Sequence, residues 1–103
     1  MSVFVSVEDP EGEQLGDVFE IDRVFKKFQK DSGFCLRFVD ESADTSFNHL
    51  QSPFLLAELE KLSGGQLEST ERAECERLLK LCAKFSGKRN AYIKFYGEAK
   101  QSE

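Results

Sequence analysis

Alternating apolar and polar residues predict a strand near each end of the chain. Valines occupy every second position of residues 3–7, and residues 91–96 alternate in the same way. Side chains of a strand point to opposite faces in turn, so a period of two is typical of a strand with one buried face. The sequence Asp-Pro-Glu-Gly at residues 9–12 then predicts a turn that begins a hairpin.

The region between this turn and residue 30 has two interpretations. Its apolar residues recur every three or four positions from 18 to 28, as on one helix face, but residues 18–21 are also compatible with a short strand. We favour a short strand or extended arm up to Ile21, followed by a helix that Asp22 caps and that ends near Lys30.

Residues 34–39 predict the clearest strand of the chain, because Phe34, Leu36 and Phe38 would share one face. A polar turn follows, and the alternation over residues 45–49 predicts a short return strand. The middle of the chain is therefore expected to add two strands to the sheet.

Two helices are predicted in the second half of the chain. Ser52 and Pro53 supply an N-cap and a proline at the first helical position, and Gly64 ends this helix. Ser69 or Thr70 caps a longer helix. The apolar positions that recur at helical spacing, and so face the core, are Leu55, Leu56, Leu59 and Leu62 in the first helix and Cys75, Leu78, Leu79, Cys82 and Phe85 in the second.

These elements follow the order ββαββααβ, which predicts a single α+β domain with a mostly antiparallel sheet of four or five strands. About three helices would pack on one face of this sheet. The chain has 103 residues, of which 40% are hydrophobic, and this is enough for one buried core. We expect the domain to span residues 1–97 and residues 98–103 to form a flexible tail.

The sequence shows no sign of a membrane segment. Its longest apolar run, residues 54–57, is far shorter than the roughly 20 residues that a membrane-spanning helix needs. No basic stretch precedes the first strand, as a signal peptide would require. Three cysteines are an odd number, which favours a reducing compartment over a disulfide framework. We therefore expect a cytoplasmic protein.

Catalytic, metal and cofactor sites are not expected. The chain has no C-x-x-C or H-x-x-x-H spacing and no glycine-rich phosphate loop. The helical spacing of Cys75 and Cys82 makes them core residues instead of reactive thiols. The only histidine, His49, and Cys35 would have to carry any acid–base or nucleophilic reaction, and no known nucleophile motif surrounds either residue. An enzyme is therefore the least favoured of three functional hypotheses.

Negative charge is concentrated near the N-terminus. The formal net charge is −5, and residues 1–22 hold seven carboxylates and no basic residue. Clustered carboxylates create a local negative potential that speeds association with a basic partner. A solvated surface without any partner is the simpler alternative. The residues expected to bind a basic partner, which we call the acidic lobe, are Glu8, Asp9, Glu11, Glu13, Asp17, Glu20 and Asp22.

The last strand offers an alternative face that would bind nucleic acid. Residues 88–95 partly follow the pattern of RNA-recognition strands, whose aromatic residues stack on bases. An acidic chain repels phosphate, so nucleic acid is a less favoured partner than a basic protein. The residues of this alternative face are Lys88, Arg89, Tyr92, Lys94 and Tyr96.

Residues 35–40 and 44–51, with Pro53 after them, resemble a stretch in short uncharacterised bacterial proteins of about this size. The resemblance implies no known activity. The small size, the acidic charge and the lack of catalytic motifs together favour a non-catalytic protein-binding module. By analogy, we expect an immunity-protein-like inhibitor that docks its acidic lobe on a basic partner protein such as a bacterial toxin. The alternative is a domain that binds RNA or single-stranded nucleic acid through the last strand and the third helix.

Overall fold

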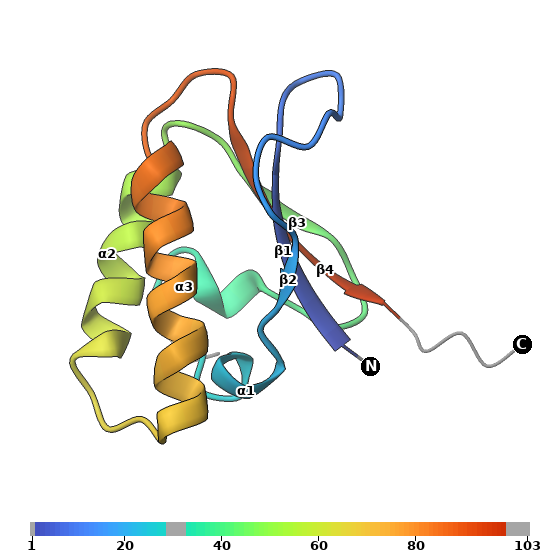
Figure 1. The fold of residues 1–103 in the computed structure, drawn as a ribbon. Coiled ribbons are helices and arrows are strands. Elements are labelled where there is room, and N and C mark those ends of the chain that lie inside the picture. Colours follow the sequence, from blue (N-terminus) through green and yellow to red (C-terminus); the bar gives the residue numbers. More distant parts are fainter. Residues whose placement is uncertain (1, 29–32, 99–103) are drawn as a thin grey trace, which may run out of the picture.

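The computed structural model, which describes residues 2–28 and 33–98, contains four strands and three α-helices (Figure 1). In chain order the elements are β1 (Ser2–Glu8), β2 (Phe19–Glu20), α1 (Asp22–Phe25), a 3₁₀ helix (Leu36–Phe38), β3 (Thr45–Phe47), α2 (Ser52–Ser63), α3 (Ser69–Phe85) and β4 (Tyr92–Glu98). The strands form one antiparallel sheet in the order β2-β1-β4-β3. The predicted α+β class and antiparallel sheet are therefore confirmed.

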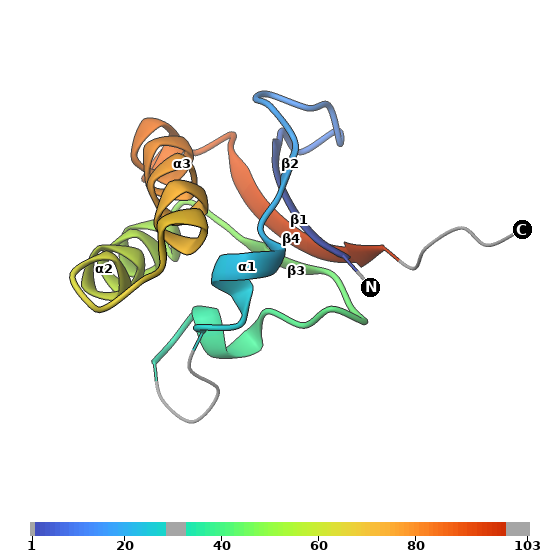
Figure 2. The same ribbon diagram turned by 60° about the horizontal axis from the view of Figure 1, so that its bottom comes forward.

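The helices cover one face of the sheet. Helices α2 and α3 lie side by side, and α1 lies near the beginning of α3 (Figures 1 and 2). The valines of β1 and two residues of β4, Ile93 and Phe95, form the buried face of the sheet. The opposite face carries Phe4, Lys94 and Tyr96, as the period-two pattern requires.

Strands β1 and β4 pair along their whole length, from Ser2 opposite Glu98 to Glu8 opposite Tyr92. The turn over residues 40–44 crosses close to the end of β4. A Cβ atom at Gly97 would overlap the backbone carbonyl of Glu41, so only glycine allows this crossing.

Helices α2 and α3 confirm the predicted periodicity, since Leu55, Leu59, Cys75, Leu78, Cys82 and Phe85 are all buried. The predicted caps were wrong. Glu68 caps α3 in a capping box with Glu71, and Ser52 is the first residue of α2, where its hydroxyl accepts a hydrogen bond from the Gly87 N–H at 2.9 Å. Among the described residues, no helix has the length and apolar character needed to cross a membrane.

The strand predicted over residues 34–39 was wrong. In its place the chain forms an irregular segment around a 3₁₀ turn, and β3 pairs with β4. The cause is the carboxylate of Glu58 on α2, which accepts hydrogen bonds from the N–H groups of three consecutive residues, Phe34, Cys35 and Leu36. These donors are then unavailable to a sheet.

The helix predicted after Ile21 is shorter than expected, and α1 ends at Phe25. Asp22 does not cap it, because its carboxylate accepts the N–H of Val3 at 2.6 Å. Residues 29 and 30 of the predicted helix lie outside the described residues. At the C-terminus, β4 extends to Glu98, and residues 99–103 of the predicted tail also lie outside them.

Candidate functional site

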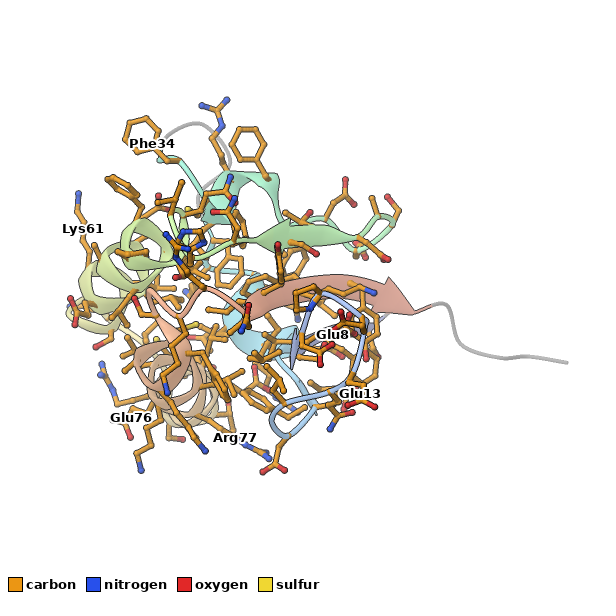
Figure 3. All side chains as sticks on the ribbon, turned by 90° about the horizontal axis from the view of Figure 1, so that it is seen from above. Glu8, Glu13, Phe34, Lys61, Glu76 and Arg77 are labelled. Atoms are coloured by element: carbon orange, nitrogen blue, oxygen red, sulfur yellow. The ribbon has the colours of Figure 1, made fainter. Side chains whose placement is uncertain are left out.

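The first four residues of the acidic lobe lie on one loop. Glu8 ends β1, and Asp9, Glu11 and Glu13 follow on the loop to β2, away from Phe34 (Figure 3). The carboxylate of Asp9 accepts hydrogen bonds from the N–H groups of Glu11 at 2.9 Å and Glu13 at 2.8 Å. Asp9 therefore shapes the loop, and the exposed side chains of Glu11 and Glu13 are carried on an ordered backbone.

A carboxylate outside the predicted set, Asp44, shares the ion-pair partner of Glu8. The ammonium group of Lys94 lies 3.9 Å from the carboxylate of Glu8 and 3.6 Å from that of Asp44. Lys94 is opposite Ser6 on β1 and Ser46 on β3, so strand pairing places Glu8 and Asp44 on opposite sides of this lysine. No local pattern could reveal this neighbour. We call Glu8, Asp9, Glu11, Glu13 and Asp44 the acidic edge.

Asp17 lies in a groove that basic residues of its own chain also line. It lines a groove of about 390 Å³ between the β1–β2 loop and α3, together with Arg77, Lys80 and Lys84. The apolar side chains of the groove include Phe19, whose ring centroid lies 4.2 Å from the Arg77 guanidinium carbon. Asp17 therefore lies in different surroundings from the acidic edge, with three basic side chains lining the same groove.

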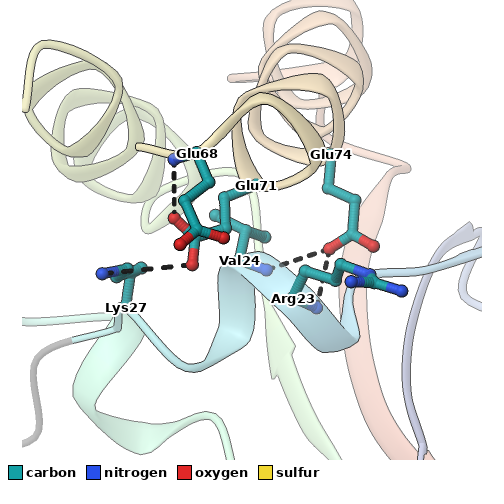
Figure 4. A network of polar contacts seen from close by, with 6 residues as sticks. All are labelled: Arg23, Val24, Lys27, Glu68, Glu71 and Glu74. Carbon is teal, nitrogen blue, oxygen red and sulfur yellow. Dashed lines mark hydrogen bonds and ion pairs between the residues drawn. The ribbon is translucent and has the colours of Figure 1, made fainter. Parts of the chain in front are cut away.

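Glu20 and Asp22 line a different cavity, of about 400 Å³, beside the N-terminus of α3. The carboxylates of α3 in this cavity hold α1 in place (Figure 4). Glu74 accepts the N–H groups of Arg23 and Val24, both at 2.9 Å, and so satisfies donors at the beginning of α1. Glu71 accepts the N–H of Glu68 at 2.9 Å and lies 4.0 Å from the ammonium group of Lys27. This acidic cluster therefore serves the local structure.

Lys94 and Tyr96, two of the five residues of the alternative nucleic-acid face, already contact other side chains of the protein. Lys94 lies between two carboxylates, and the ring of Tyr96 stacks on Phe4 with centroids 5.5 Å apart. Tyr92 is 36% exposed, and Lys88 and Arg89 are exposed between α3 and β4. Phosphate would have to compete with Glu8 and Asp44 for the central cation of this face, which weakens the nucleic-acid interpretation.

The thiols are buried as core groups. Cys35 is 2% exposed, and its Sγ donates a weak hydrogen bond to the Gln51 carbonyl at 3.8 Å. Burial, and secondarily the nearby Glu58 carboxylate, raise the pKa of the Cys35 thiol to about 11. Burial also raises the pKa of Cys82 to about 12. These thiols are protonated at neutral pH and are poor nucleophiles.

The structure also exposes a group of large apolar side chains that was not among the predicted site residues. The exposed fractions are 77% for Phe34, 57% for Phe38, 68% for Leu50 and 59% for Phe54, and we call these four residues the aromatic surface. The rings of Phe34 and Phe54 meet edge to face at 6.4 Å, and the Arg37 guanidinium carbon lies 5.4 Å from the centroid of the Phe38 ring. Of these four, Phe34 and Phe38 were expected on one face of a strand over residues 34–39, which the structure does not form.

In the part of the chain that the structure describes, no group of three or more His, Cys, Asp or Glu side chains is arranged to hold a metal ion. Two surfaces therefore stand out as candidate sites: the acidic edge and the aromatic surface. No protein-family model matches the chain, and neither does any curated protein or solved structure.

Proposed function

We propose that the chain is a non-catalytic protein-binding module whose acidic edge docks on a basic partner protein. The observation that carries the proposal is the approach of two carboxylates from separate segments, Glu8 at the end of β1 and Asp44 before β3, to the single ammonium group of Lys94, with three further carboxylates following Glu8 on the β1–β2 loop. Such a grouping attracts a basic surface over about 8–10 Å at physiological salt. The proposed docking set, the acidic edge, therefore keeps four of the seven residues of the acidic lobe and adds Asp44.

The fixed backbone conformation of the β1–β2 loop favours a role in binding a partner over a role in solubility alone. The two hydrogen bonds to Asp9 fix the backbone that carries Glu11 and Glu13, so little loop freedom is lost when a partner binds. The specific form of the proposal is an immunity-protein-like inhibitor that covers a basic bacterial toxin. The buried free thiols are consistent with a reducing compartment, and we place this inhibitor in the cytoplasm.

The experiment compares two variants with the same change in net charge. Glu11→Gln/Glu13→Gln removes two charges from the acidic edge, and Glu60→Gln/Glu76→Gln removes two exposed charges from α2 and α3. Wild type and each variant are immobilised on a resin and incubated with a lysate of the source organism. The captured proteins are then quantified by mass spectrometry. We expect a basic protein to be lost selectively with the edge variant.

The recovered partner is then mixed with both variants in a stopped-flow instrument. The edge variant should associate at least several-fold more slowly, with little change in dissociation, because exposed charges act mainly on encounter. Identical captured proteins for wild type and both variants would contradict the proposal, and so would equal slowing by the control variant.

A further inference from the structure

The aromatic surface is large for an isolated domain. A phenylalanine ring that becomes buried removes roughly 150–250 Å² from water, so the three partly exposed rings present about 400 Å². This is as large as the largest apolar patch on a typical monomer, and such patches are often functional. The rings of Phe34, which precedes the 3₁₀ helix, and Phe54 on α2 contact each other, so this part of the patch joins two separate segments of the chain.

The backbone beneath the surface is held in place. The carboxylate of Glu58 accepts the N–H groups of Phe34 at 2.6 Å and of Cys35 and Leu36 at 3.0 Å. At the other end of the segment, the Thr45 hydroxyl donates to the Phe38 carbonyl at 2.9 Å. The exposed rings therefore stand on a fixed support, which lowers the entropic cost of binding.

The charges around the surface are positive. Arg37 lies against Phe38, and Lys61 follows Phe54 by seven positions on the same face of α2. No ion pair among the described residues involves Arg37 or Lys61. The carboxylate on this face of α2, Glu58, is already engaged by three backbone donors. A second copy of the chain would bring like charges together and would carry the same net charge of −5.

From this combination we propose that the aromatic surface binds a short segment of a partner protein in which large apolar side chains stand beside Asp or Glu. The apolar side chains cover the rings of Phe34 and Phe54, and the carboxylates pair with Arg37 and Lys61. Charge-assisted pairs at the rim of an apolar contact fix the register of the segment, and the covered rings supply the affinity.

The test uses random 16-residue peptides displayed on phage and selected on the full chain. We expect enriched peptides to combine Leu, Ile, Phe or Trp with Asp or Glu. Their binding should weaken at least tenfold in Phe34→Ser and in Phe54→Ser, and several-fold in Arg37→Gln/Lys61→Gln. Phe34 lies before the 3₁₀ helix, Phe54 lies on α2, and both are mostly exposed, so circular dichroism should show an unchanged fold in each variant.

Two controls separate this surface from the rest of the molecule. Leu15→Ser removes an apolar side chain that is 42% exposed on the β1–β2 loop, and Glu11→Gln/Glu13→Gln alters the acidic edge. Neither control substitution should weaken peptide binding. Failure of this inference is therefore distinguishable from failure of the proposed function, which depends on the acidic edge.

Four results of the peptide experiment would overturn the inference. They are no enrichment, enrichment of basic peptides, binding that is insensitive to both phenylalanine substitutions, and binding lost in either control. A dimer seen by sedimentation equilibrium and dissociated by Phe34→Ser would also overturn it, because it would assign the surface to a second copy.

Discussion

Glu58→Ala tests how the aromatic surface is supported. Hydrogen bonds to a charged group contribute about 1.5–3 kcal/mol each when their donors are shielded from water. Of the three donors, the Phe34 N–H is exposed and can bind water instead, whereas the N–H groups of Cys35 and Leu36 are partly buried. Because these two donors are only partly shielded, each bond contributes less than the fully shielded value, and the substitution should lower the free energy of unfolding by about 2–4 kcal/mol. Glu58→Gln keeps one oxygen acceptor and should cost about half as much.

Urea denaturation measures this change, and thiol labelling locates it. Release of the segment should expose Cys35 and speed its modification by a thiol reagent. Cys75 and Cys82 are fully buried on α3 and serve as internal controls, read by mass spectrometry of peptides. Glu60→Ala, an exposed position on the same helix, should change stability by less than about 0.5 kcal/mol. If Glu58→Ala behaves like Glu60→Ala and Cys35 labelling is unchanged, the carboxylate does not hold this segment.

Three further outcomes are expected. Gly97→Ala should lower stability in urea by about 1–3 kcal/mol, because its Cβ would overlap the Glu41 carbonyl, and an unchanged midpoint would contradict this close crossing. Fluorescence anisotropy with a labelled single-stranded oligonucleotide should show no binding at about 0.15 M salt, since the central lysine of that face is ion-paired. A steeply salt-dependent isotherm lost in Tyr92→Ala would favour nucleic acid instead. The free energy of unfolding should fall as the pH rises above 9, because unfolded thiols ionise near pH 9.0 while burial raises the pKa of Cys35 to about 11 and of Cys82 to about 12. The fall between pH 8 and pH 10 should be smaller in Cys35→Ala/Cys82→Ala, and an equal fall would refute this cause.

The candidate sites could be predicted only in part. Seven carboxylates near the N-terminus were visible as a cluster, and the turn at Asp9 was recognisable from its residues. The sequence did not reveal how these carboxylates divide among the acidic edge, the groove beside α3 and the cavity at α1. This division depends on which cations and backbone donors the fold places near each carboxylate. Asp44 entered the acidic edge through the pairing of β3 with β4, which no spacing along the chain reveals.

By itself, the sequence determined the elements whose signal is local. The alternating valines of β1, the alternating apolar residues of β4, and the helical repeats of α2 and α3 match the observed elements within a few residues, because each pattern states directly which face an element buries. The tertiary structure alone decided the conformation of residues 34–39. Their alternation favours a strand, but Glu58 lies on a helix formed later in the chain and satisfies the same N–H groups. A backbone N–H group must find an acceptor in the folded chain, and here the acceptor is a carboxylate more than 20 residues away in sequence, which a local pattern does not reveal. For this reason Phe34 and Phe38 lie on the surface, although their pattern predicts a core.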